Sequence, residues 1–313
     1  IEINAEIIQI LYRDYGFNNL LIESDCWALL DHSENELPLP YRLPIHENWS
    51  KIKEFQPVLH LADSTKFKVY GFDSRLHASY HDEEVLKFIN DHWTSELSAQ
   101  KTFARKVIRD LLINEFADTN STATLQKVEE TLSNWAKHAI EADDDTAFKV
   151  AMLHNYVNQL LLERSSSDQY IEIREQYMSL NAKHLLKNVL AGKKTIVWGA
   201  NVHVQRGVTE LSAHSQGNVG DVIHQLDSNS ISVMITSVKG KFRHGSGKLF
   251  SINKPTKGSV PHTLMQDKVP YALIDLRKLS ENQFLYHQEE PKATNLGDFV
   301  LYVRDNRPST ILE

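Results

Sequence analysis

The most constraining feature of this sequence is a short apolar run that breaks at a glycine and continues into a polar segment. Residues 193–207 read Lys-Lys-Thr-Ile-Val-Trp-Gly-Ala-Asn-Val-His-Val-Gln-Arg-Gly. β-Branched residues followed by a glycine are typical of a buried strand whose carboxyl end opens into a loop. Open α/β sheets bind their ligands at that end of their strands. The stretch therefore predicts a strand ending at Trp198, and it makes Asn201 and His203 candidate site residues.

Two further apolar runs end on a carboxylate. Residues 19–23 end at Glu23, and residues 66–73 alternate in polarity and end at Asp73. Further strand patterns at 231–236, 271–275 and 299–303 are interspersed with helical segments, which is typical of a parallel or mixed sheet. We therefore predict an α/β fold with a parallel or mixed central sheet flanked by helices.

A long helical region interrupts these strands. Residues 82–190 repeat apolar side chains at helical spacing almost throughout. We predict that residues 1–81 form the first part of an α/β core, residues 82–190 a helical insertion, and residues 191–313 the second part of the core.

Each candidate site residue also has a purely structural interpretation. The chain has 15 histidines, so most of them cannot be catalytic, and the presence of His203 does not by itself indicate an active site. Glu23 could be a solvated loop acid or lie beside a helix N-cap. Asp73 could form a local ion pair with Arg75 that orders a turn.

The last helix of the insertion leaves a similar choice. Arg174, Tyr177 or Met178, and Asn181 follow at helical spacing, so one face combines a cation, apolar bulk and an amide. This face fits either the wall of a pocket or a half-exposed helix edge.

Composition narrows the class of partner. Lys and Arg number 34 against 41 Asp and Glu, which gives a formal net charge of -7 without a dense basic run. This balance argues against a nucleic-acid or anionic-membrane surface and favours a small-molecule substrate or ligand. No apolar run approaches the roughly 20 residues that span a bilayer, so we expect a soluble, cytoplasmic protein. The oligomeric state stays open.

No cofactor and no metal are expected. The single cysteine, Cys26, excludes a multi-cysteine zinc site, and the acidic residues 141–145 fit the first turn of a helix better than a metal site. Residues 245–248, Gly-Ser-Gly-Lys, lack the upstream glycine of a phosphate-binding loop. The chain also begins without a methionine, so we expect residues upstream of Ile1.

Several segments in order resemble the erythromycin esterase family. They are Tyr15-Gly16-Phe17, the strand ending at Glu23, Val69 to Asp73, Ile173 to Met178 with Asn181, and Ile196 to His203, of which the last is the most specific. The resemblance implies an α/β hydrolytic fold with a helical insertion. It also implies that water, activated by histidine and glutamate, opens macrolide lactones, a chemistry associated with antibiotic resistance.

The resemblance assigns roles to particular residues. Glu23 matches the acidic residue at the end of the family's second strand, and His203 matches the second histidine of its Trp-x-His-Asn-x-His segment. Asn201 matches the amide of that segment. We further expect that Asp73, Arg75, Arg174 and Asn201 contact the substrate or order the groups around it. A histidine base needs a carboxylate that orients it, so we expect Glu23 and His203 to act together, directly or through another group.

Three departures from the family pattern bear on activity. Ala200 replaces the first histidine of the segment, and Asn4 stands where the family usually has an arginine. The family's Gly-Glu-x-x-His segment, which carries its proposed general base, belongs on a strand upstream of the first helix of this sequence. We therefore expect a hydrolase that is weak or inactive on macrolides. The alternative is a family member without catalysis that binds a small molecule in the same cleft.

Overall fold

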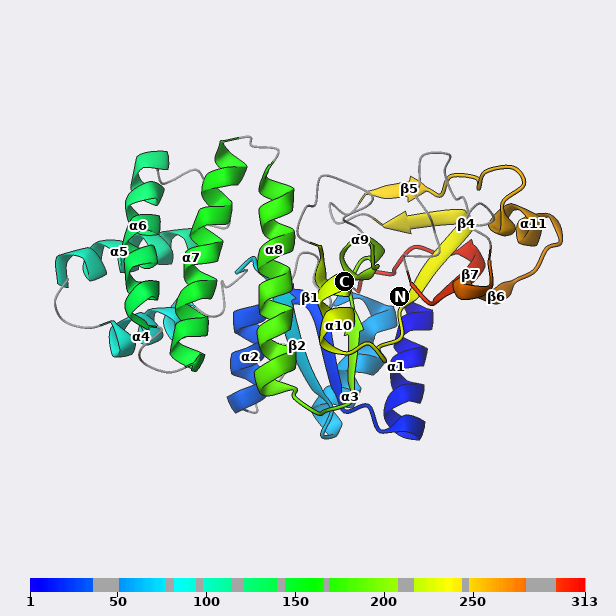
Figure 1. Ribbon diagram of the computed structural model, residues 1–313, viewed down its shortest axis with the longest axis horizontal. Coiled ribbons are helices and arrows are strands. Elements are labelled where there is room, and N and C mark those ends of the chain that lie inside the picture. Colours follow the sequence, from blue (N-terminus) through cyan, green and yellow to red (C-terminus); the bar gives the residue numbers. More distant parts are fainter. Residues whose placement is uncertain are drawn as a thin grey trace. The chain divides into compact units, whose positions relative to one another are not determined.

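The structure is a computed structural model (Figure 1). It describes residues 1–35, 51–76, 82–93, 98–113, 121–139, 144–165, 169–207, 217–243, 248–279 and 297–312. Most of the acidic cluster at 141–145 and the glycines at 245 and 247 lie outside these ranges. The chain divides into two units, each assembled from segments that are distant in sequence. Unit 1 comprises Ile1–Gly16, Trp49–His60 and Ile196–Glu313, and unit 2 comprises Phe17–Asn48 and Leu61–Thr195.

Unit 2 contains a pair of parallel strands, β1 (Asn19–Asp25) and β2 (Lys68–Asp73). Both strands are buried over nearly their whole length, as expected for apolar runs covered on both faces. Helix α2 (Cys26–Asn35) follows β1 without a loop and packs against β2. The Asp25 carboxylate accepts a hydrogen bond from the Ala28 amide at 2.9 Å, which satisfies one of the free amides of the first turn.

The rest of unit 2 is helical. α6, α7 and α8 pack against one another in chain order, and α8 also packs on β2 (Figure 1). Edge-to-face contact between Trp27 and Phe88, with ring centroids 5.1 Å apart, joins α4 to α2. The helices are α4 (Asp82–His92), α5 (Ser98–Ile113), α6 (Thr122–Ala139), α7 (Asp144–Arg164) and α8 (Gln169–His184), and α8 continues into a π-helical turn, η5 (Leu185–Val189).

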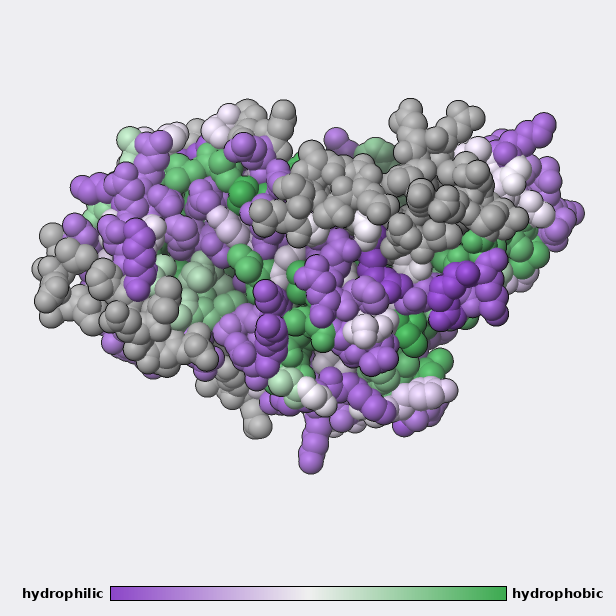
Figure 2. Space-filling view, viewed as in Figure 1, coloured by the Kyte–Doolittle hydropathy of each residue, from purple (hydrophilic) through white to green (hydrophobic). Residues whose placement is uncertain are grey.

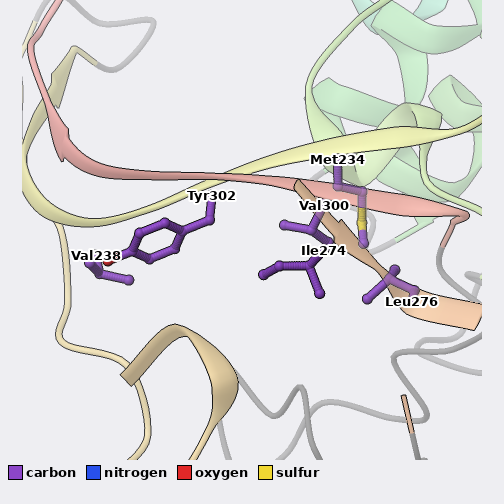
Figure 3. Close-up of a cluster of buried hydrophobic side chains, with 6 residues drawn as sticks. All are labelled: Met234, Val238, Ile274, Leu276, Val300 and Tyr302. Carbon is purple, nitrogen blue, oxygen red and sulfur yellow. The ribbon is translucent and has the colours of Figure 1, made fainter. Parts of the chain in front are cut away.

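Unit 1 contains a mixed sheet of strand order β5-β4-β7-β6. β4 pairs in parallel with β7, whereas β5 and β6 are the antiparallel edge strands. One face of this sheet packs on α11, and its core includes the fully buried ring of Tyr302, which points toward Val238 (Figure 3). The elements are β4 (Val233–Arg243), β5 (Leu249–Ser251), α11 (Val260–Gln266), β6 (Tyr271–Asp275), η7 (Leu276–Lys278) and β7 (Phe299–Asn306).

Shorter elements complete unit 1. α1 is followed by Gly16, which caps the helix with a φ of 71°, a left-handed conformation that glycine adopts without strain. The Phe55 ring of η3 lies 5.5 Å from the ring of Trp198. These elements are α1 (Glu2–Tyr15), η3 (Lys53–Phe55), α9 (Asn201–Val204) and α10 (Val219–Leu226); α3 (Gln56–Ser64) and β3 (Thr195–Trp198) cross from one unit into the other.

The predicted α/β fold with parallel or mixed sheets and a helical insertion is confirmed. The strands predicted at 19–23 and 271–275 are present, but β4 begins at Val233 and runs to Arg243, well past the predicted end at 236. The extension pairs with β5 and is largely exposed, so it lacks the apolar signal that marks a buried strand. On the face drawn in Figure 2, hydrophobic residues lie in several small areas among hydrophilic ones, as is usual for a protein surface.

Candidate active site

A bulge in β1 sets the position of Glu23. Ile22 lies opposite Gly71 and Asp25 opposite Asp73, so β1 contains one residue more than β2 over this interval. An extra residue bends the strand and changes the direction of the side chains beside it, and such bulges often occur near active sites. Glu23 is one of the two residues within the bulge, and its side chain is 22% exposed in an otherwise buried strand.

Gly71 makes this bulge sterically possible. A Cβ atom at this position would lie 2.3 Å from the carbonyl oxygen of Asp25 and 2.4 Å from that of Ser24. No side chain fits at these distances, because the obstructing atoms belong to the backbone. The glycine in the Val69 to Asp73 segment therefore permits the close approach of the two strands.

Arg174 of α8 joins the carboxyl ends of the two strands. Its guanidinium donates a hydrogen bond of 2.8 Å to the Asp73 carboxylate and a longer one of 3.4 Å to the Glu23 carboxylate. Asp73 is buried, with 2% of its side chain exposed, and Arg174 is 15% exposed. The short buried contact makes Asp73 the main counter-ion of Arg174. Glu23 is the more exposed of the two acids, and its contact with Arg174 is the longer one.

The electrostatics keep Arg174 charged. Burial by itself would lower the pKa of the guanidinium, but the neighbouring carboxylates of Asp73 and Glu23 outweigh it and raise the pKa above its ordinary value. The site therefore contains a permanent cation beside two carboxylates.

Arg75 lies beside this cluster and has partners of its own. Its backbone amide donates to Asp73 at 3.2 Å, and its guanidinium lies 3.9 Å from the Glu163 carboxylate and 5.5 Å from the centre of the Tyr170 ring. Burial, followed by repulsion from Arg174, lowers the pKa of Arg75 from its usual high value. The site thus contains two cations, Arg75 and Arg174, and three carboxylates, those of Glu23, Asp73 and Glu163. These groups come from β1, β2, α7 and α8 or from residues directly after them.

The α8 face that carries Arg174 is buried. Tyr177, Met178 and Asn181 are 9%, 0% and 2% exposed, and the Asn181 amide donates to the Phe72 carbonyl of β2 at 3.3 Å. The alternative of a half-exposed helix edge is therefore wrong for this face. Arg174 and Asn181 are tolerated inside because they bind the strand ends.

His203 lies in unit 1, on the single helical turn α9. The ring is largely buried, at 9% exposure, and the His203 amide donates to the Ala200 carbonyl at 2.9 Å. Asn201 begins this turn and forms two hydrogen bonds with Ile235 of β4: its amide nitrogen donates to the carbonyl at 2.8 Å, and its oxygen accepts from the backbone amide at 3.4 Å. Both ends of the Asn201 amide therefore hold the turn on the sheet.

The structure brings three of the predicted site residues into direct contact: Glu23, Asp73 and Arg174. Arg75 adjoins them, whereas Asn201 and His203 belong to the other unit. The pairing of Glu23 with His203 and the catalytic role of each stay predictions. Glu163 and Tyr170 were not predicted as site residues. Both lie in helices, α7 and α8, and the apolar pattern of these helices indicates only which residues are buried in the core.

A family model for erythromycin esterase matches residues 57–307, which is most of the chain. The chain belongs to the erythromycin esterase family. The match includes Asp73, Arg174 and His203, and Glu23 lies before it. A search of the curated proteins finds no match.

Solved structures share the fold of this family member at low identity. A crystal structure of a Bacillus cereus protein is 16% identical with a TM-score of 0.68, and covers 99% of this chain and 86% of its own. A succinoglycan biosynthesis protein is 18% identical with a TM-score of 0.72, covering 98% and 84%. A mutant of the erythromycin esterase EreC in its open conformation is 12% identical with a TM-score of 0.65, covering 99% and 87%.

None of the helices within the described residues is long and apolar enough to cross a lipid bilayer.

Proposed function

We propose that this chain hydrolyses an ester or lactone by activation of water, with His203 as the general base and Glu23 as the carboxylate that assists it. The observation that carries the proposal is the strand-end cluster in which Arg174 holds Asp73 and Glu23. Family membership supports hydrolysis, because the erythromycin esterase model matches most of the chain.

The geometry of the cluster favours Glu23 as the reactive acid. Arg174 is neutralised chiefly by the buried Asp73, at 2.8 Å, and its longer contact with Glu23, at 3.4 Å, orients this more exposed carboxylate. A carboxylate that is partly exposed and held by a fixed cation can accept a further hydrogen bond from water, from an imidazole or from a substrate. Asp73 and Arg174 then serve to position Glu23.

Ala200 supports poor activity on macrolides. The residue before α9 offers only a methyl group where the family has a histidine, and a methyl group neither donates nor accepts a proton. Loss of one acid–base or oxyanion group commonly lowers turnover by about a hundredfold or more. We propose smaller or more reactive esters as the better substrates.

The same substitution supports a second candidate function. A chain that retains the charged cluster but lacks one acid–base group could bind a small molecule without cleaving it. A binding protein of this kind would use Arg174, Arg75 and the partly exposed Glu23 to hydrogen bond a polar ligand.

The test is a panel of activated esters, simple lactones and a 14-membered macrolide, with product formation followed by mass spectrometry. We expect turnover of at least one activated ester, much slower opening of the macrolide, and loss of both in His203→Gln.

The matched control is His154→Gln. His154 is also a partly buried histidine, hydrogen bonded to Glu129 at 2.7 Å between α7 and α6. Equal rates in the two histidine variants would contradict the role of His203. Saturable binding of a panel member without turnover would favour the binding protein.

A further inference from the structure

The start of α10 is bound tightly to the turn that carries His203. Asn218 and Asp221 form a reciprocal capping box, in which each side chain accepts a hydrogen bond from the backbone amide of the other, at 3.1 and 3.3 Å. Both side chains also reach beyond their own helix. The Asn218 amide donates to the Val202 carbonyl at 2.8 Å, and Asp221 accepts from the Gly207 amide at 2.8 Å.

These two contacts hold the segment on either side of His203. Val202 precedes the histidine, and Gly207 ends the segment four residues after it. The capping box is thus shared between α10 and the His203 turn, so a change in the cap alters both. A cap that served only α10 would need neither of the two outside contacts.

Gly220 brings α10 into direct backbone contact with the same segment. A Cβ atom here would lie 2.3 Å from the Val204 carbonyl oxygen and 2.4 Å from that of Gln205. Gly220 is the second residue of α10. Its presence is explained by the close approach to residues 204 and 205.

The same segment is also anchored to the sheet of unit 1. Asn201 holds the Ile235 backbone, as described above, and the Arg206 guanidinium lies 2.7 Å from the Asp298 carboxylate. Asp298 in turn accepts from the Ser232 amide at 2.8 Å. The His203 turn therefore has contacts with β4, with Asp298 just before β7, and with the start of α10.

We infer that the start of α10 is a clasp that positions the His203 imidazole, with Gly220 and Asp221 as its positioning residues. The inference rests on the proposed function, since the direction of the ring affects a rate only if His203 transfers a proton. Proton transfer requires the reacting atoms to be held within tenths of an ångström of their productive separation, and a displacement of about 1 Å can cost a hundredfold in rate.

Two variants test the clasp in different ways. Gly220→Ala forces α10 away from Val204 and Gln205. Asp221→Asn keeps the shape of the side chain but leaves one oxygen to serve two amides, so one of the two contacts is lost.

Each variant has a matched control in unit 1. Gly240→Ala also creates a backbone clash, with the Asn306 carbonyl 2.0 Å from the new Cβ, but it lies in the β4–β7 pair. Asp227→Asn removes the same charge at the far end of α10, where Asp227 accepts from the Asn229 amide.

The primary readout is a nitrogen–proton correlation spectrum of histidine-labelled protein, with the His203 ring signal assigned by its absence in His203→Gln. We expect this signal to shift or broaden in Gly220→Ala and Asp221→Asn and to keep its position in both controls. The His154 signal, from unit 2, should stay in place in all four proteins. With an ester that the wild type hydrolyses, kcat should fall about tenfold to a hundredfold while KM changes less than twofold.

The spectrum and the rates separate the two claims. An unchanged His203 signal in both folded α10 variants would overturn the clasp, and so would an altered signal with unaltered kcat. An altered signal in a protein that hydrolyses no ester would support the clasp as a structural device and count against the proposed function alone.

Discussion

At the scale of single residues, the burial of one ion pair is the main determinant of the candidate site. Arg174 and Asp73 are both largely removed from water and lie 2.8 Å apart. Removal of one partner from such a pair is far more costly than removal of the whole pair, since the other charge is left buried without compensation.

Arg174→Met should therefore destabilise the fold strongly. We expect a loss of about 3–5 kcal/mol in the free energy of unfolding, measured with urea, because Asp73 is then a buried carboxylate without its cation. Arg174→Lys, which keeps the charge but not the planar fork, should lose clearly less. A loss under about 1 kcal/mol for Arg174→Met would show that another group neutralises Asp73.

The residue types at the site could be predicted from the sequence, but their contacts could not. Glu23 and Asp73 end two apolar runs, and the family resemblance adds Arg174. Glu23 and Asp73 are 151 and 101 positions from Arg174, and no local pattern specifies that a helix of the insertion places a guanidinium beside both of them. Similarly, Asp73 and Arg75 are close enough in sequence to suggest a local pair, but nothing in the sequence indicates that Asp73 also binds the Arg75 backbone amide and the more distant Arg174.

At the scale of elements, the parallel pair of β1 and β2 is irregular at the point where Glu23 lies. The sequence predicts both strands well, because each is a short apolar run followed by an acid. It does not predict the bulge, since register depends on the partner strand rather than on the strand itself. It indicates α2 only through the possibility that Glu23 lies beside a helix N-cap, because α2 begins with apolar residues directly after the strand and without a turn.

Gly71→Ala should test whether the bulge depends on the absence of a side chain. The new methyl group would collide with the Asp25 and Ser24 carbonyls, and overpacking of this kind costs about 1–3 kcal/mol. We expect a lower midpoint of thermal unfolding together with reduced hydrolysis, since Glu23 lies in the displaced segment.

Gly192→Ala is the comparison for that variant. Gly192 has a left-handed φ of 69° but no atom within 4 Å of the added Cβ, so it reports only the conformational preference of glycine. Loss of hydrolysis in both variants to the same extent would show that lowered stability, and not the bulge, is responsible.

At the scale of the whole molecule, the fold and the family are established more firmly than the chemistry. The erythromycin esterase model spans 57–307, and the similar solved structures cover nearly the whole chain at identities below 20%. Similarity at that level concerns the fold, and a fold hosts many activities. The proposed activity depends on a few groups, and the resemblance to the family implies that Glu23 and His203 keep its pattern while Ala200 and Asn4 depart from it.

The role of Glu23 in hydrolysis is tested most directly by a comparison of Glu23→Gln with Glu129→Gln. Both variants are assayed with the ester of the panel that the wild type hydrolyses fastest. Both glutamates are partly buried, with 22% and 26% of their side chains exposed, and both are hydrogen bonded to a nitrogen of another side chain. We predict that Glu23→Gln lowers kcat/KM by about a hundredfold or more with little change in unfolding, and that Glu129→Gln leaves kcat/KM within about twofold of the wild type. Equal activity of Glu23→Gln and the wild type would contradict the account.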